Sequence, residues 1–227
     1  MCGRYWVNRM KKVIVNEFNV YEVATDVKPD YNITPGRLVL CVMKNGHNKL
    51  VSFRWGLIPS WAKDPQIGYK MVNARAETLI EKPSFFKPFQ TQRCLVVADG
   101  FYEWRKEGRE KIPLAIRLRN DKPFAFAGLY DRWQSPENEL ITSCTIITTT
   151  PNELLAPIHN PIPAILTPEA RESWLDNTIT NPLKLIPLLK PYNAQEMEAY
   201  EVSSQVNSVK NNNPDLIKPV SNKINKL

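Results

Sequence analysis

The chain has 227 residues, 43% of them hydrophobic and 23% charged, which is ordinary for a globular protein with a sizeable core. No apolar run reaches the length of a membrane-spanning helix, and charged residues interrupt the N-terminal stretch where a signal peptide would be apolar. The net charge of +7 favours a polyanionic partner such as nucleic acid, although no dense block of Lys and Arg occurs. We therefore expect a cytoplasmic protein with no membrane partner.

Short strands and short helices follow one another irregularly, and 19 prolines spread along the chain break up long helices. In the first half we expect a helix at 11–18, strands at 38–43 and 50–55, a helix at 75–81 and a strand at 93–98. A hairpin at 101–118 follows, turning around Lys106-Glu107-Gly108, with a strand at 111–118. The second half predicts strands at 124–129 and 143–149 and helices at 152–156, 168–176 and 181–189.

The helix at 168–176 has the clearest start signal. Thr167 is a good N-cap, Pro168 suits the first helical position, and Glu169 lies in the first turn. Because the elements lack regular βαβ alternation, we expect an α+β fold. The predicted architecture is one compact domain over residues 1–220, with mostly antiparallel β-sheets in a barrel-like core and short peripheral helices. Residues 221–227 are predicted to be a frayed C-terminal tail.

The sequence gives little support for disulfides or metal sites. None of the four cysteines belongs to a C-x-x-C pair, and Cys41, Cys94 and Cys144 lie in apolar strand-like runs where a reduced, buried thiol is usual. Only two histidines, His47 and His159, are present. We therefore expect no metal and no cofactor.

The remaining cysteine, Cys2, follows the initiator methionine. If Met1 is removed, Cys2 carries a free α-amine and a thiol on neighbouring carbons. Their ordinary pKa values are about 8 and about 8.5, so both nucleophilic forms are accessible near neutral pH. The amine can condense with an aldehyde to an imine, and the thiol can close on that imine to form a thiazolidine. The alternative is a small packed cysteine without a chemical role.

Separated segments form a recognisable set, in the order MCGRY (1–5), YNITPG (31–36), FRWGLIPSWAKDP (53–65), NARAET (73–78), ADGFYEW (98–104), IHNPIPAIL (158–166) and VSSQVNSVKNNNPDLIKPV (202–220). Together they resemble the SRAP (SOS-response-associated peptidase) family, whose members crosslink to abasic sites in single-stranded DNA. The resemblance runs from residue 1 to about residue 220 and implies a compact fold of antiparallel sheets and short helices.

The resemblance also implies a catalytic set, which falls on Cys2, Asn73, Glu103 and His159. It implies a thiazolidine link between Cys2 and the ring-opened abasic sugar, and a thiol autopeptidase activity that removes the first residue. Family members bind single-stranded DNA along a basic groove. The partner expected from it is therefore single-stranded DNA with abasic sites, bound by a monomer that is nucleoid-associated while on DNA.

Each catalytic assignment has a physical reason and an ordinary alternative. Opening an abasic sugar requires proton transfer, which a carboxyl group or an imidazole performs. Glu103 gains a useful pKa if it is partly buried, but it could be an exposed strand residue. His159 has an ordinary pKa suited to proton transfer, but it could be a loop residue with satisfied hydrogen bonds. Asn73 can orient the Cys2 amine or a sugar hydroxyl, but it could be a helix cap.

Candidate DNA contacts are Arg4 and Arg75 for phosphates and Trp61 and Trp104 for bases. The alternatives are surface ion pairs for the arginines and core packing for the tryptophans, and for Trp55 we favour the core. The sequence departs from the family at one point. The family has an arginine two residues after its histidine, where this chain has Pro161. The loss of one phosphate contact predicts weaker, less salt-dependent DNA binding.

Three functions stay open at this stage. The first is a lyase-like abasic-site processing protein that captures its substrate covalently. The second is an N-terminal-nucleophile hydrolase that uses the Cys2 thiol with its α-amine as base. The third is a non-catalytic single-strand-binding protein in which Cys2 has no role.

Overall fold

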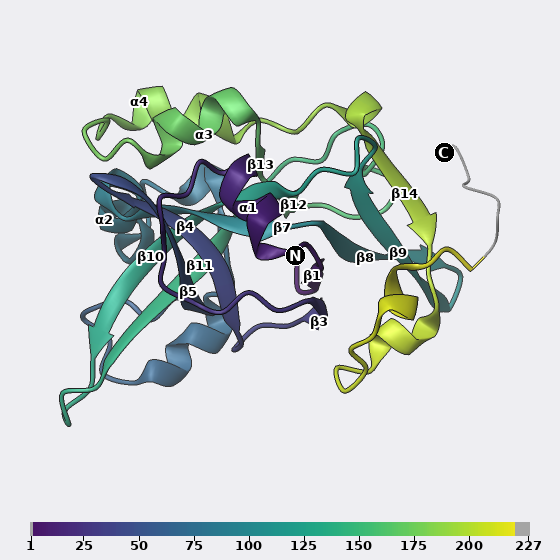
Figure 1. Cartoon of the computed structure of the whole chain (residues 1–227), viewed down its shortest axis with the longest axis horizontal. Coiled ribbons are helices and arrows are strands. Elements are labelled where there is room, and N and C mark those ends of the chain that lie inside the picture. Colours follow the sequence, from purple (N-terminus) through teal and green to yellow (C-terminus); the bar gives the residue numbers. More distant parts are fainter. Residues whose placement is uncertain (1, 221–227) are drawn as a thin grey trace.

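The structure is a computed structural model, and it describes residues 2–220. Five strands close into a barrel, visible at the left of Figure 1. In order around the ring they are β4 (Leu38–Asn45), β5 (His47–Trp55), β11 (Leu140–Thr149), β10 (Phe124–Gln134) and β7 (Arg93–Ala98), which pairs with β4 again. Only the β5–β11 pair in this ring is parallel. The barrel confirms the predicted fold class, and all its strands contain predicted segments.

A second, antiparallel sheet lies beside the barrel. Its strands, in order, are β14 (Met197–Glu201), β9 (Glu110–Leu118), β8 (Gly100–Glu107), β1 (Tyr5–Val7) and β3 (Asp30–Ile33). Strands β8 and β9 form the predicted hairpin, with Glu107 opposite Glu110. Gly108 in the turn has a φ of 59°, a conformation that glycine adopts without strain.

The two faces of this second sheet bury different partners. Side chains alternate along a strand, so Phe101 and Glu103 of β8 face one way, whereas Tyr102 and Trp104 face the other. Phe101 packs against Phe126 of the barrel strand β10, with ring centroids 5.9 Å apart. The opposite face is covered by residues 203–220, which include the 3-10 turns η5 (Ser204–Asn207) and η6 (Pro214–Ile217).

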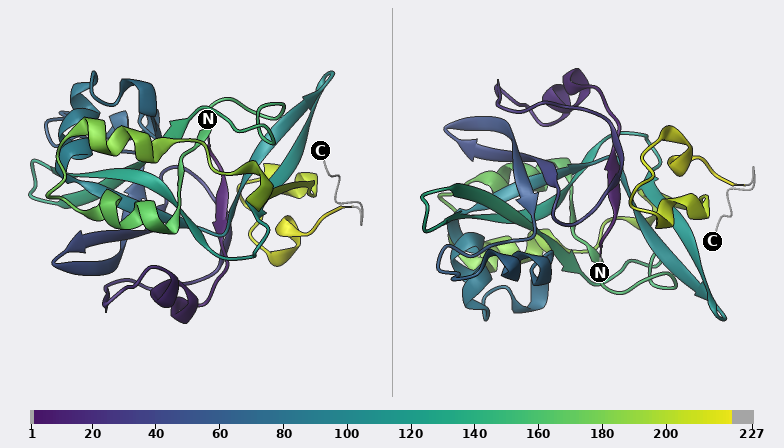
Figure 2. Two further views of the ribbon diagram at one scale, coloured as in Figure 1. Left: turned by 90° about the horizontal axis from the view of Figure 1, so that it is seen from above. Right: turned by 90° about the horizontal axis from the view of Figure 1, so that it is seen from below.

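Strand β1 lies between these two bodies. Its Tyr5 packs edge-on against Trp55 and Phe126 of the barrel. Its Trp6 packs on the other face, against Tyr102. In both views of Figure 2, β1 crosses the middle of the molecule with α1 (Lys11–Glu17) to one side. Cys2, three residues before Tyr5, therefore lies at the junction of barrel and sheet.

Short elements complete the structure. The remaining strands are β2 (Glu22–Val23), β6 (Asn73–Arg75), β12 (Ile162–Pro163) and β13 (Ile165–Leu166). The remaining helices are α2 (Pro83–Thr91), α3 (Pro168–Leu175) and α4 (Pro182–Leu185), with 3-10 turns η1 (Pro65–Lys70), η2 (Ala76–Thr78), η3 (Ile186–Leu189) and η4 (Ala194–Glu196). The predicted tail, 221–227, lies outside the described residues.

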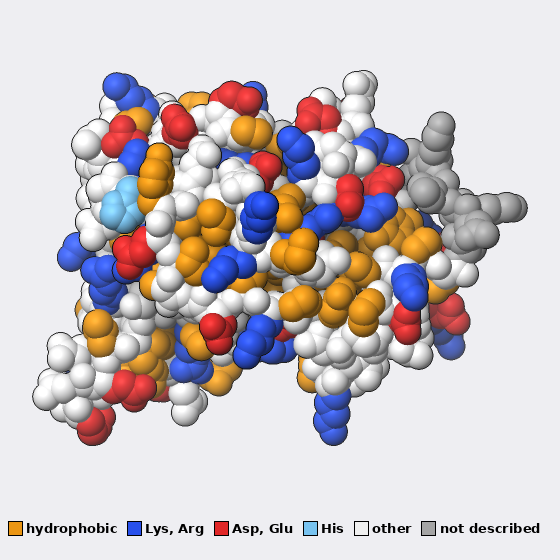
Figure 3. Space-filling model, in the orientation of Figure 1, with side chains coloured by type: hydrophobic (Ala, Val, Ile, Leu, Met, Phe, Trp, Pro, Cys, Tyr) orange, Lys and Arg blue, Asp and Glu red, His pale blue; other side chains and the backbone are white. Residues whose placement is uncertain are grey.

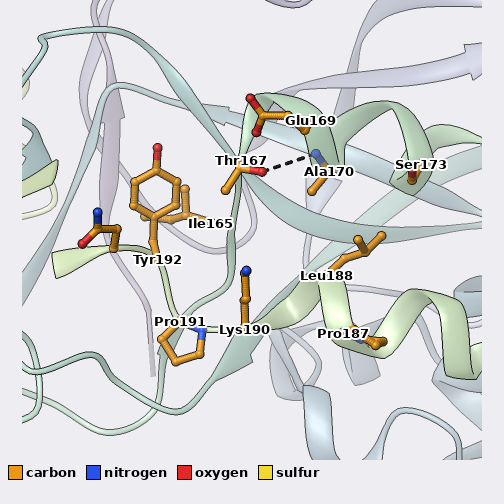
Figure 4. Close-up of a pocket in the computed structure, with 11 residues that line it drawn as sticks. Ile165, Thr167, Glu169, Ala170, Ser173, Pro187, Leu188, Lys190, Pro191 and Tyr192 are labelled. Carbon is orange, nitrogen blue, oxygen red and sulfur yellow. Dashed lines mark hydrogen bonds between the residues drawn. The ribbon is translucent and has the colours of Figure 1, made fainter. Parts of the chain in front are cut away.

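Helices α1 and α3 confirm two predictions. Thr167 caps α3 as expected, since its Oγ1 accepts a 3.3 Å hydrogen bond from the Ala170 amide (Figure 4). The segment 181–189 is helical but divided into α4 and η3, because Pro187 has no amide hydrogen to continue the ladder.

Two predicted helices are wrong. Residues 75–81 do not form a helix, because β6 pairs with β11 and takes Arg75 with it, which leaves only the short turn η2. Residues 152–156 form turns between Pro151 and Pro157 rather than a helix. The Asn152 side chain accepts from the Leu155 amide as a helix cap would, but Pro157 has no amide hydrogen to continue a helical ladder.

Helix α2, which contains Pro83 and Pro88, was not predicted. Pro83 occupies the start of the helix, where its missing amide costs nothing. Phe85 and Phe89, one helical turn apart, are both buried and anchor the helix to the core. That spacing is the sequence signal that could have found it.

Candidate active site

Cys2 is fully buried at the junction of the two sheets. The Asn73 side chain reaches it, and its Nδ2 donates a 2.9 Å hydrogen bond to the Cys2 carbonyl oxygen. Asn73 lies there because β6 pairs in parallel with β11, with Asn73 opposite Ile146. Two residues that the sequence placed in one site are thus joined directly.

Glu103 belongs to the same site. It projects from β8 on the barrel-facing side and is only 4% exposed, so the alternative of an exposed strand residue is excluded. Burial raises the pKa of the Glu103 carboxyl to about 8. At neutral pH this group therefore holds a proton most of the time and can donate it.

His159 completes the set from the loop between β11 and β12. Its Nδ1 lies 3.7 Å from Oε2 of Glu103. Partial burial lowers the pKa of the His159 imidazole, so the ring is neutral at neutral pH. A protonated carboxyl beside a neutral imidazole is an acid and a base in one pair, rather than an ion pair.

The Cys2 thiol differs from the sequence-based expectation. Burial and the nearby Glu103 carboxyl both raise the pKa of the thiol well above its ordinary value. The free-thiol value used in the sequence argument therefore does not apply, and the buried sulfur stays protonated near neutral pH. A thiol in this state needs a base at the moment it reacts.

Two buried acceptors in this site have no hydrogen-bond partner within residues 2–220. They are Oδ1 of Asn73 and Oε1 of Glu103. A buried polar atom without a partner costs about 1–3 kcal/mol, so both atoms are available to accept a hydrogen bond from a ligand or a reacting group. Both atoms belong to residues that flank Cys2.

Arg4 and Trp104 lie together on the opposite face of the second sheet, and Arg4 is two residues after Cys2, directly before β1. The Arg4 guanidinium lies 5.7 Å from the ring centroid of Trp104, and its Nη1 donates to Oδ1 of Asn32 at 2.8 Å and to the Val206 carbonyl at 2.6 Å. Trp104 is half-buried, and its Nε1 donates to Oδ1 of Asn207 at 2.8 Å. Arg4 is thus held by the fold, and no surface ion pair accounts for it among the described residues.

The other two candidate DNA residues are exposed. Arg75 ends β6, two residues beyond Asn73, and Trp61 is 60% exposed after the end of β5. Trp55 is buried in the core as expected, with its Nε1 bonded to the Val72 carbonyl. An exposed tryptophan of this size is available to a ligand, whereas Trp55 is not.

The charge distribution is mixed on one face of the molecule. In Figure 3, Lys and Arg side chains lie among Asp and Glu side chains rather than in one continuous basic area. A cavity of about 500 Å³ beside α3, with Thr167, Leu188 and Tyr192 in its wall, contains none of the candidate site residues (Figure 4). The volume of a cavity therefore does not identify the candidate site. The polar side chains that converge on Cys2 identify it.

Within residues 2–220, no group of three or more His, Cys, Asp or Glu side chains is arranged to hold a metal ion. No helix in the same part of the chain is long and apolar enough to cross a membrane.

Sequence comparison decides the family. The family model of the SOS response associated peptidase (SRAP) matches residues 1–209. The chain belongs to the SRAP family. The resemblance seen in the sequence is therefore confirmed, and it places this chain among proteins linked to abasic-site processing and DNA repair.

Two SRAP relatives illustrate the range of similarity. "Abasic site processing protein YoqW" of Bacillus subtilis is 50% identical over 221 residues, which are 96% of this chain and 99% of the relative. "Abasic site processing protein HMCES" of Gallus gallus is 35% identical over 195 residues, 75% of this chain and 57% of that longer protein. A crystal structure of a Bacteroides thetaiotaomicron protein superposes with a TM-score of 0.89 at 29% identity, and covers 97% of this chain and 100% of its own.

Sequence reasoning missed one buried polar residue that contacts a candidate DNA-binding residue, Arg4. Asn32 is 1% exposed and bonds to Arg4, yet it was noted only as part of the YNITPG segment. The SRAP match ends at residue 209, before the η6 turn that helps to cover Tyr102 and its neighbours. No sequence signal could have found Asn32, because the carbonyls to which its amide bonds, of Ser208 and Asn211, come from the other end of the chain.

Proposed function

We propose that this protein captures abasic sites in single-stranded DNA covalently, through a thiazolidine between Cys2 and the ring-opened deoxyribose. The observation that carries the proposal is the convergence of Asn73 and Glu103 on a buried Cys2, with His159 beside Glu103. The proposal requires removal of Met1, so that Cys2 carries the α-amine. The SRAP relatives, named as abasic site processing proteins, support it.

The first chemical step opens the sugar. An abasic deoxyribose is mostly a closed hemiacetal, and opening it needs a proton delivered to the ring oxygen and one removed from the C1′ hydroxyl. The protonated Glu103 carboxyl is suited to deliver the first, and the neutral His159 imidazole to accept the second. The products are a C4′ hydroxyl and a C1′ aldehyde.

The next steps form the link. The Cys2 amine adds to C1′, and loss of one water molecule gives an imine. The Cys2 sulfur then adds to the same carbon while its proton moves to the nitrogen, which closes the five-membered ring. Asn73 holds the Cys2 carbonyl, and its Oδ1 is suited to accept from the α-amine. Because the thiol is protonated in the resting site, Glu103 or His159 is suited to relay its proton to the nitrogen as the ring closes.

We further propose that Arg4 and Arg75 contact phosphates on either side of the abasic site and that Trp61 and Trp104 stack on neighbouring bases. Bases of any identity stack on an aromatic ring, so such contacts would suit a protein that reads the lesion rather than a sequence. Arg75 lies two residues after Asn73 on β6, and Arg4 lies two residues after Cys2, directly before β1.

A denaturing gel tests this function. Purified protein is incubated with single-stranded DNA that carries one abasic site, with Cys2→Ala as control. A heat-stable adduct that needs Cys2, and that disappears when methoxyamine blocks the aldehyde first, is the expected result. An adduct that survives methoxyamine would refute the thiazolidine, and intact DNA binding without an adduct would leave a non-catalytic single-strand-binding protein. Mass spectrometry of the N-terminus should show that Met1 is absent.

A further inference from the structure

The side chain of Asn32 is the centre of a hydrogen-bonded unit that joins three parts of the chain. It lies on β3 and is 1% exposed. Its Oδ1 accepts from Nη1 of Arg4 at 2.8 Å. Its Nδ2 donates to the carbonyls of Ser208 at 3.0 Å and Asn211 at 2.8 Å, with the Val206 carbonyl at a longer 3.5 Å.

The chemistry of these partners fixes which way the amide points. Carbonyl oxygens only accept hydrogen bonds and a guanidinium only donates them, so nitrogen must face the C-terminal segment and oxygen must face Arg4. An aspartate in this position would have no donor for the carbonyls. An apolar residue would leave both sides without partners in a buried place.

Neighbouring bonds make the same connection rigid. The Val206 carbonyl also accepts from Arg4, and the Tyr31 amide donates to Oδ1 of Asn212 at 2.8 Å. The Tyr102 hydroxyl donates to the Tyr31 carbonyl at 2.9 Å. The segment 203–217 is thus bonded to β3, and through the bond between Trp104 and Asn207 to β8, although it extends beyond the residues that the SRAP family model matches.

The charge of Arg4 is left uncompensated by this arrangement. Its bonds go to a neutral amide and a neutral carbonyl, and among residues 2–220 no carboxylate forms an ion pair with it. The guanidinium is held over Trp104 by groups that cannot cancel its charge. A fixed arginine with its charge free of a carboxylate is what a phosphate contact needs.

We propose that Asn32 is a positioning residue for DNA binding, which locks Arg4 against Trp104 through neutral acceptors so that Arg4 stays rigid and positively charged for a DNA phosphate. This inference rests on the proposed function, since it assigns the phosphate contact to Arg4. It adds the C-terminal segment to the DNA-binding surface as its support. It also gives a reason for an amide at position 32, because a carboxylate there would neutralise Arg4.

The test is the salt dependence of single-stranded DNA binding by Asn32→Asp. The probe is an oligonucleotide without an abasic site, so that binding is reversible. Asn32→Asp should bind roughly tenfold more weakly at low salt, and the slope of log affinity against log salt should fall by about 0.7, the value for one lost phosphate contact on a single strand. Asn16→Asp, an exposed change on α1 with the same charge difference, should leave the slope as in the wild type.

A merely structural role would lower the fraction of active protein without changing this slope. A double-mutant cycle makes the distinction sharper. If Asn32 acts through Arg4, Asn32→Asp in an Arg4→Ala background should change the slope no further. Amide hydrogen exchange should also become faster in residues 204–217 of Asn32→Asp. If Asn32→Asp does not fold, Asn32→Ser is measured in the same way.

The outcomes separate this inference from the function it rests on. If the wild type forms the Cys2-dependent adduct and the Asn32 variants keep the wild-type salt slope, the role of Asn32 is refuted, whereas the proposed function is not. An unchanged exchange rate in residues 204–217 would also refute it. Wild-type protein that binds DNA with a normal slope but forms no adduct would refute the covalent mechanism and leave the positioning role standing. Wild-type protein that does not bind DNA would refute both.

Discussion

The side-chain amide of Asn73 and the main-chain carbonyl of Cys2 are joined by a 2.9 Å hydrogen bond. Strand β6, which carries Asn73, is fixed by its pairing with barrel strand β11. The bond therefore ties Cys2 to the barrel. In the proposed reaction Cys2 supplies both the amine and the thiol. Its position therefore determines how often these groups lie in a reactive geometry with the aldehyde.

This relationship predicts that Asn73→Asp slows adduct formation by about a hundredfold, the effect of a misplacement of about 1 Å at a reacting centre. Aspartate has nearly the same shape but cannot donate to the Cys2 carbonyl. Rates are measured in single-turnover gel assays at saturating DNA, with Asn16→Asp as the charge-matched control. A rate for Asn73→Asp within about twofold of the wild type would contradict the positioning role.

The raised pKa of Glu103 predicts that the free energy of unfolding depends on pH. Its pKa is raised from 4.5 to about 8 by burial, so between these values the folded protein keeps a proton that the unfolded chain has released. The stabilisation is fully present below pH 4.5 and is lost as the pH rises through about 8. Across that window this group should lower the free energy of unfolding by at most about 1.4 kcal/mol per pH unit.

Urea unfolding of the wild type and Glu103→Gln at several pH values checks this. Glutamine cannot ionise, so the stability of the variant relative to the wild type should increase from pH 5 to pH 9. His159, with its lowered pKa, contributes the opposite slope at lower pH in both proteins, and it largely cancels in the difference. A difference that does not change with pH would contradict the raised pKa of Glu103.

The pH profile of adduct formation follows from the same groups. The α-amine must be neutral, which favours a pH above about 8, whereas Glu103 must be protonated, which favours a pH below about 8. The rate should therefore be bell-shaped near that value. Glu103→Gln should be slower and should lose the alkaline limb. A variant that keeps the same alkaline limb would assign that limb to another group.

The barrel was predictable from the sequence because its strands are long, β-branched and bounded by turn residues. The orientation of Glu103 was not predictable. The alternation of side chains in GFYEW is the same whichever face of the strand is buried, and the pairing of β8 with β1 decides which face that is. The alternative for Asn73 was a cap before a helix at 75–81, and the pairing of its segment with a strand more than 70 residues away overrode that local preference. Asn32 could not be given a role because its partners come from the other end of the chain.

We predict that replacing Trp61 changes DNA binding without changing stability. It is 60% exposed, so replacing it removes little buried surface. If it stacks on a base, Trp61→Ala should weaken single-stranded DNA binding by about 1–3 kcal/mol, whereas the melting temperature should stay within a degree or so of the wild type. Tyr21→Ala, which removes another exposed aromatic ring, is the matched control. Equal affinities for Trp61→Ala and the wild type, measured by fluorescence anisotropy, would remove Trp61 from the proposed surface.

For Arg93, which is not part of the candidate site, we predict that replacement lowers stability. Its guanidinium is buried beneath the ends of two helices. It donates to the carbonyls of Phe89 and Gln90 at the end of α2, and to those of Trp174 and Asp176 at the end of α3. These are carbonyls that a helix leaves without partners, so one side chain caps both helices.

Arg93→Met keeps most of the volume but removes every donor. It should lower the free energy of unfolding by about 3–5 kcal/mol, because several buried carbonyls lose their partners together. Arg132→Met, an exposed change on the neighbouring strand β10, should cost less than about 0.5 kcal/mol. Both are measured by urea unfolding. A loss for Arg93→Met as small as that for Arg132→Met would mean that water replaces the guanidinium, and that the two helix ends do not depend on this cap.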